Sequence, residues 1–163
     1  METGLSTGSL LLRALAVALL IAANAFFVAA EFALVASRRT RVDAMVRKGD
    51  RKAKTVQAAL QDLYRQLSAA QLGITLASIL LGYVAEDTVA VLLRDWLAAL
   101  PAALAFFSRA AVASVVAVLV ISFLHVVIGE QAPKAWAITY PEATSRWIAA
   151  PLIFFSEIGR AHV

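Results

Sequence analysis

Three long apolar runs constrain the fold of this chain more than any other feature of its sequence. They cover residues 10–36, 67–85 and 110–130, with boundaries that are approximate to a few residues. Each reaches roughly the 20 residues that an α-helix needs to cross about 30 Å of hydrocarbon. Because 61% of the 163 residues are hydrophobic as well, the sequence predicts an all-α membrane protein with three transmembrane helices, rather than an apolar soluble bundle.

Shorter helices are expected outside these runs. Residues 38–66 are polar, and Gly49-Asp50 divides them into a juxtamembrane hairpin of two helices, with Asp50 as the N-cap of the second. The segment of about 88–100 has an apolar face interrupted by Arg94 and Asp95, so we expect an interfacial or re-entrant helix rather than a fourth span. The segment of about 141–158 is amphipathic, which predicts an interfacial helix. Together these elements form a single transmembrane domain over residues 1–163.

The basic residues indicate the orientation in the membrane. Nine basic and three acidic side chains lie between Arg38 and Arg65. By the positive-inside rule this loop is cytoplasmic, so the N-terminus is outside and the C-terminus inside. We therefore expect a multi-pass protein of the cell inner (plasma) membrane whose basic loop contacts membrane lipid and not nucleic acid.

Two carboxylates lie where a membrane helix tolerates them least. Glu31 is inside the first run and Glu130 lies at the end of the third, and ionisable groups at such depth usually mark an ion path, a proton relay or a paired site. At 1.5 Å per residue, Glu31 lies about 10 Å from the basic boundary, and Thr75 and Ser78 lie about 12 and 16 Å past the start of the second run. The four side chains are expected to converge in the inner half of the membrane, although Glu130 is also compatible with an interfacial position.

Carboxylate, hydroxyl and carbonyl oxygens are hard ligands, which suit Mg²⁺ or Ca²⁺ and to a smaller extent Na⁺. Pro133 adds a carbonyl to this set. It has no N–H, so the carbonyl of Gly129, four residues earlier, loses its helical partner. A free carbonyl in a transmembrane helix is tolerated where it lines a cavity or binds a cation.

Structural roles account for some of the same residues. In the second run, Ser68, Gln71, Thr75, Ser78 and Gly82 follow one another at steps of three or four residues and so share one helix face. Such a row of hydroxyl and small residues is also typical of helix packing. Asn24 is compatible with an interhelical hydrogen bond, and His125 with a buried structural histidine. Glu31 is compatible with an ion pair to Lys134 or Arg38. Cysteine is absent, and no nucleophile–base motif, phosphate loop or zinc spacing is found, so we do not expect an enzyme.

Three motifs resemble the transmembrane domain of the cyclin M / CorC (HlyC/CorC) family of magnesium transporters. They are Asn-Ala-Phe-Phe-Val-Ala-Ala-Glu-Phe-Ala-Leu at 24–34, Gln-Leu-Gly-Ile-Thr-Leu-Ala-Ser at 71–78 and Gly-Glu-Gln-Ala-Pro-Lys at 129–134. Their order and spacing match as well, and the likeness covers nearly the whole chain.

The resemblance implies a homodimer that exports Mg²⁺, coupled to Na⁺ entry, with a dehydrated Mg²⁺ held by oxygen ligands from all three helices. Carried over to this sequence, the ligands are the carboxylate of Glu130, the carbonyl of Gly129 and the hydroxyl of Ser78. Cytoplasmic regulatory domains of the cystathionine-β-synthase type follow in the family, and we expect none within these 163 residues.

Two positions depart from the family pattern. Serines are common before the glutamate of the first span, where this chain has Val28, Ala29 and Ala30, so only backbone oxygens such as the carbonyl of Ala30 remain. Asparagine is common in the second span, where this chain has Ile74 and Ser78.

Thr75 is a further candidate ligand, and Glu31 is expected to balance charge or to belong to the coupling-ion path. The alternatives are a membrane sensor or scaffold that transports nothing, and a proton-coupled transporter of another cation.

Overall fold

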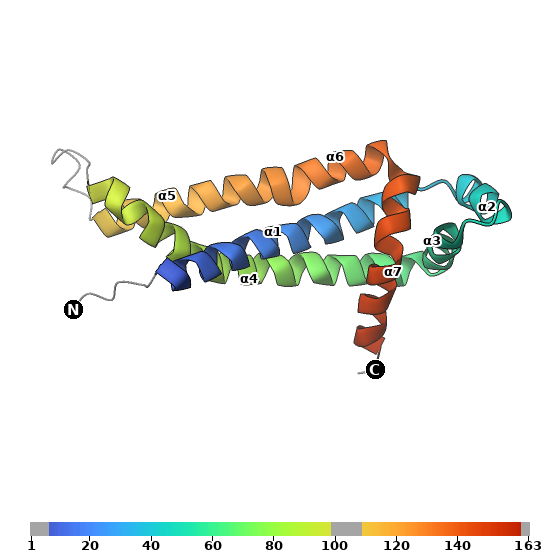
Figure 1. Ribbon diagram of the computed structural model, residues 1–163, viewed down its shortest axis with the longest axis horizontal. Coiled ribbons are helices and arrows are strands. Elements are labelled where there is room, and N and C mark those ends of the chain that lie inside the picture. Colours follow the sequence, from blue (N-terminus) through green and yellow to red (C-terminus); the bar gives the residue numbers. More distant parts are fainter. Residues whose placement is uncertain (1–6, 99–108, 161–163) are drawn as a thin grey trace.

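The computed structural model describes residues 7–98 and 109–160, and this part of the chain is helical with no strands. Three long helical rods lie side by side (Figure 1). They are α1 (Thr7–Ala36), α4 (Leu63–Ala98), and a third rod of α5 (Arg109–Leu124), the π-helix η2 (His125–Gln131) and α6 (Ala132–Thr139). The stretches long and apolar enough to span a membrane are Gly8–Ala36, Leu63–Ala85 and Val115–Thr139. The predicted all-α fold with three candidate spans is confirmed.

The second rod is longer than the predicted span. The segment expected as a span at 67–85 and residues 88–98 of the expected interfacial helix belong to one helix, α4, which continues to Ala98. Residues 99 and 100 of that expected helix lie outside the described residues. Neither glycine nor proline occurs between residues 83 and 98, so the chain has no local reason to break there. Thr88 supports the continuation, because its hydroxyl donates to the carbonyl of Val84 one turn earlier at 2.7 Å.

The third rod changes its helical geometry where the Gly-Glu motif begins. The N–H of Ala132 donates to the carbonyl of Val127, five residues earlier, as in a π-helix. Pro133 follows in the first turn of α6, where its missing N–H is tolerated. The apolar rod therefore passes the proline and continues to Thr139, beyond the expected end of the span near residue 130.

The predicted hairpin is present between the first two rods. It consists of α2 (Arg39–Arg47) and α3 (Arg51–Gln61). Gly49 turns the chain with φ +86°, a conformation that favours glycine. The carboxylate of Asp50 caps α3 by accepting from the N–H groups of Lys52 at 2.9 Å and Ala53 at 3.2 Å.

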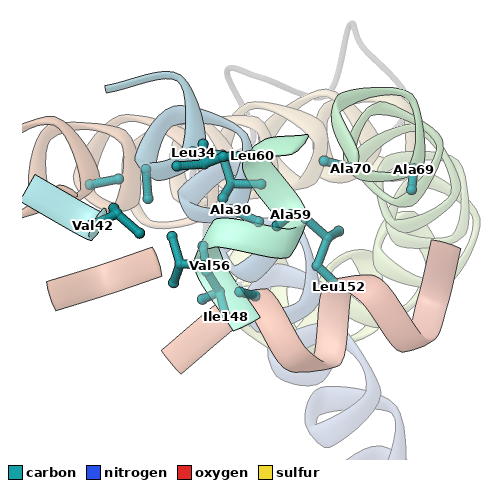
Figure 2. Close-up of a cluster of buried hydrophobic side chains, with 13 residues drawn as sticks. Ala30, Leu34, Val42, Val56, Ala59, Leu60, Ala69, Ala70, Ile148 and Leu152 are labelled. Atoms are coloured by element: carbon teal, nitrogen blue, oxygen red, sulfur yellow. The ribbon is translucent and has the colours of Figure 1, made fainter. Parts of the chain in front are cut away.

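The last helix, α7 (Pro141–Arg160), crosses the hairpin end of the bundle (Figure 1). Small and aliphatic side chains from six helices pack there into one core, drawn in Figure 2 with Ala30, Leu34, Val42, Val56, Ala59, Leu60, Ala69, Ala70, Ile148 and Leu152 labelled. Ion pairs from Arg41 to Glu142 at 3.6 Å and from Arg146 to Asp50 at 3.0 Å link the hairpin to α7. The hairpin and α7 thus form a packed base from which the three rods extend.

Candidate cation site

A cavity of about 510 Å³ opens above this base, and all three rods contribute to its wall. Its lining residues are Asn24, Val28, Glu31 and Phe32 of α1, Gln71, Ile74, Thr75 and Ser78 of α4, and His125, Glu130 and Lys134 of the third rod. The four oxygen-bearing side chains expected to converge, those of Glu31, Thr75, Ser78 and Glu130, all belong to this wall. The structure therefore brings together residues up to about 100 positions apart in the sequence.

The two carboxylates of the cavity are half-buried. Within residues 7–98 and 109–160, neither Glu31 nor Glu130 makes a salt bridge or a side-chain hydrogen bond, so the ion pair of Glu31 with Lys134 or Arg38 is not formed. The ammonium of Lys134 instead lies 4.5 Å from the ring centroid of Phe32, a cation–π contact. The cavity wall thus carries two carboxylates with free acceptor positions and one ammonium.

A polar cluster at the cavity wall joins the three rods. The side-chain amide of Asn24 donates to the carbonyl of Gly129 at 3.0 Å. The hydroxyl of Ser78 donates to the Asn24 carbonyl oxygen at 3.3 Å and lies 3.5 Å from Nε2 of His125. Asn24 is only 1% exposed. We call these four residues the polar clasp, and the interhelical hydrogen bond considered for Asn24 is confirmed.

Gly129 allows the close approach on which the clasp depends. A Cβ at this position would lie 3.0 Å from Cδ2 of His125 and 3.4 Å from Nδ2 of Asn24. The carbonyl expected to be free because of Pro133 accepts from Asn24 in this structure. A carbonyl oxygen has two lone pairs, so it keeps one acceptor position for a further ligand. Gly129 itself is buried and is not part of the cavity wall.

Comparison with known proteins supports the resemblance seen in the motifs. The family described as "Cyclin M transmembrane N-terminal domain" matches residues 15–160. The chain belongs to this family. UPF0053 protein YhdP of Bacillus subtilis is 43% identical over 144 residues, which cover 87% of this chain and 32% of YhdP. UPF0053 protein YugS of Bacillus subtilis is 40% identical over 149 residues, covering 91% of this chain and 34% of YugS.

A mycobacterial relative gives the same picture. The uncharacterized protein Rv1841c of Mycobacterium tuberculosis is 42% identical over 147 residues, covering 89% of this chain and 40% of Rv1841c. The chain therefore spans about a third of the length of the curated relatives it matches. With its three apolar rods, this cyclin M domain is a membrane protein.

The remaining predicted ligands of the cyclin M domain lie in different surroundings. Ala30 is fully buried in the core of Figure 2 and is not part of the cavity wall. The hydroxyl of Thr75 lies at the cavity and donates to the carbonyl of Gln71 at 2.9 Å. Its lone pairs stay available to a cation or to water.

The predicted ligand set did not include four polar residues of the cavity wall, Asn24, Gln71, His125 and Lys134. Helical spacing is the signal that could have found them. Gln71 precedes Thr75 by four residues, and Lys134 follows Glu130 by four, so each lies one turn from a predicted ligand on the same helix face.

The donor set of the cavity matches hard cations. Among the described residues, no three His, Cys, Asp or Glu side chains lie close enough together to hold a metal ion by themselves, so a cation in this cavity would also need hydroxyl, amide or water oxygens. The oxygen-bearing side chains of the cavity wall are two carboxylates, two hydroxyls and two amides. Such oxygen ligands suit Mg²⁺ or Ca²⁺, which accept water for the rest of their coordination shell.

Proposed function

We propose that this cyclin M domain exports Mg²⁺ across the cell inner membrane by alternating access, driven by Na⁺ entry. The observation that carries the proposal is the cavity between the three rods, in which Glu31 and Glu130 have no protein partner among the described residues. A carboxylate held half-buried without a partner is costly in a membrane, unless a cation is bound there for part of the time.

The volume of the cavity supports a partly hydrated ion. Mg²⁺ loses water reluctantly and usually keeps several water ligands in proteins. Six waters occupy about 180 Å³ at roughly 30 Å³ each. The cavity of about 510 Å³ accommodates such an ion, so the missing serine and asparagine oxygens can be replaced by water.

In this proposal Glu130 is the main anionic ligand, and the hydroxyl of Ser78 contributes a second oxygen. Thr75 acts through its lone pairs, and Gly129 contributes a carbonyl. Ala30 is left out of this ligand set, because it is buried in the apolar core away from the cavity wall. Because Asn24 already donates to the Gly129 carbonyl, coordination there uses the second lone pair or requires the polar clasp to open.

Glu31 balances the charge of the cation or takes part in the Na⁺ path. The basic hairpin lies in the cytoplasm, which places the N-terminus outside. The working unit is a homodimer, with cytoplasmic regulatory domains in the longer protein.

Flux measurements on Glu130→Gln test the proposal. The chain is reconstituted in liposomes, and Mg²⁺ efflux is followed under an imposed Na⁺ gradient. A hydrogen bond or ligand bond to a charged group contributes about 1.5–3 kcal/mol, so loss of the charge lowers Mg²⁺ affinity about 10- to 100-fold. Glu157→Gln is the matched control, because this exposed glutamate of α7 is not part of the cavity wall.

The outcomes separate the alternatives. Unchanged Mg²⁺ binding and flux in Glu130→Gln would contradict the ligand assignment. Binding without flux in the unmodified chain would indicate a sensor or scaffold. Flux that follows a pH gradient and ignores Na⁺ would indicate a proton-coupled transporter.

A further inference from the structure

A second hollow, separate from the cation cavity, lies where α6 meets α7. Its volume is about 420 Å³, and its lining residues are Trp136, Tyr140, Ala143, Thr144, Trp147 and Ile148. We call it the aromatic groove. Trp136, Tyr140 and Trp147 are 63%, 51% and 73% exposed. Large aromatic side chains with such exposure are typical of the membrane–water interface, where one end of the ring system is apolar and the other meets water.

The position of the groove in the fold agrees with an interfacial site. Thr139 is the last residue of the third candidate span, so Trp136 and Tyr140 lie on either side of the point where the rod ends. Their rings contact each other with centroids 5.0 Å apart. From there α7 crosses the bundle instead of continuing along it (Figure 1). The groove therefore lies at the end of the third candidate span, where a membrane–water interface is expected.

One side of the groove is positively charged. The ammonium of Lys52, on α3, lies 3.5 Å from the ring centroid of Trp147, which forms part of the groove wall. Further exposed cations of the hairpin make no salt bridge with any described residue; they are Arg47, Lys48, Arg51 and Lys54. An apolar groove with the ammonium of Lys52 at its edge matches a ligand that is apolar along its length and anionic at its end.

We propose that the aromatic groove binds one anionic phospholipid of the surrounding membrane. An acyl chain lies against Trp136 and Trp147, and the phosphate-bearing headgroup lies near Lys52. A zwitterionic lipid fits the apolar part equally well, but it lacks the net negative charge that the cations of Lys52 and the hairpin attract. This site does not depend on the proposed transport of Mg²⁺, because the groove and the cavity share no lining residue.

Tryptophan quenching tests the proposal directly. The chain has three tryptophans, and Trp96→Phe with Trp136→Phe leaves Trp147 as the only one. This variant is reconstituted in phosphatidylcholine bilayers that contain a small fraction of brominated phosphatidylglycerol or, separately, brominated phosphatidylcholine. A basic side chain near the surface contributes about 1 kcal/mol to the binding of an anionic lipid, so we expect an approximately fivefold preference for phosphatidylglycerol.

Charge variants identify the cation responsible. Lys52→Gln is expected to remove most of the preference, whereas Lys54→Gln is expected to keep it. Both remove one exposed positive charge from α3, but it is Lys52 that contacts Trp147. Quenching is expressed as the ratio between the two lipids within each variant, so a change in the brightness of Trp147 cancels. Equal losses in both variants would show diffuse attraction by the hairpin and overturn the proposal.

A groove-filling variant separates the groove from the general lipid shell. Ala143 is an exposed residue of the groove wall, so Ala143→Phe fills the space with little cost in folding. It is expected to abolish the preference for phosphatidylglycerol while the helical circular dichroism spectrum stays the same. An unchanged preference for phosphatidylglycerol in Ala143→Phe would overturn the proposal. Equal quenching of Trp147 by the two brominated lipids before this substitution would overturn it as well, and is the result expected if the groove binds a protein segment.

Discussion

Asn24 holds the three rods together through side-chain hydrogen bonds, and its replacement by leucine tests how much these bonds contribute. The side chain donates to Gly129 on the third rod at 3.0 Å and accepts from Ser78 on α4 at 3.3 Å. Leucine has the same number and branching of side-chain heavy atoms as asparagine, so Asn24→Leu removes both bonds while keeping the shape of the side chain.

The expected magnitude follows from these two bonds. Interhelical hydrogen bonds in membrane proteins contribute about 0.6 kcal/mol on average and up to about 1.7 kcal/mol. Loss of the donor also leaves the buried carbonyl of Gly129 without its partner, which costs about 1–3 kcal/mol. We therefore expect Asn24→Leu to lower the free energy of unfolding by about 1–3 kcal/mol. Loss of the bond between Ser78 and Asn24 costs less, because Nε2 of His125 remains 3.5 Å from the Ser78 hydroxyl.

Reversible unfolding in mixed detergent micelles measures this free energy. Ser122→Leu serves as the control, since it places the same side chain on an exposed position of the third rod. A double-mutant cycle with Ser78→Ala then isolates the bond between the two side chains, for which we expect a coupling of about 0.6 kcal/mol. If Asn24→Leu is as stable as the control, the clasp does not hold the rods together and the reasoning fails.

Two further predictions concern the helices around the site. Gly73→Ala is expected to cost about 1–3 kcal/mol, because its Cβ would lie 2.5 Å from ring atoms of Phe27, whereas Gly82→Ala meets no atom within 4 Å and is expected to stabilise the same helix by about 0.5–1 kcal/mol. The unfolding assay above compares them, and equal effects would contradict the packing of α1 on α4. Asp50→Ala is expected to cost about 1 kcal/mol by loss of the α3 cap, and Asp50→Asn clearly less, because asparagine also caps helices. Hydrogen exchange in α3 measures both, and an equal loss would assign the effect to the ion pair with Arg146.

Local patterns were sufficient to predict much of this fold. The spans follow from uninterrupted apolar runs, whose length relates directly to the thickness of a membrane. The hairpin follows from Gly49-Asp50, because a glycine with positive φ and an aspartate cap act within a few residues of the chain. The convergence of Glu31 and Glu130 followed from counting residues from the ends of the spans, since helical rise is nearly constant.

Other features depend on contacts that helical periodicity does not contain. The side-chain amide of Asn24, 105 residues away, donates a hydrogen bond to the carbonyl of Gly129. The presence of Pro133 alone therefore could not show whether that carbonyl is free. Lys134 was considered as a partner for Glu31, but its ammonium lies over the ring of Phe32. These outcomes are decided by how α1 and the third rod face each other, which a single helix does not specify.

The π-helix between α5 and α6 has a consequence for the third rod as a whole. A π-turn is equivalent to one extra residue in an α-helix, so it offsets the angular phase of everything after it by about 100°. Before this offset α5 packs against α4, and after it α6 packs against α1. If His125–Gln131 adopted regular α-helical turns without losing a residue, α6 would rotate about its axis by about 100°. Lys134 would then turn from the cavity wall and Trp136 from the aromatic groove, so the π-helical geometry of this short segment sets the alignment of both sites.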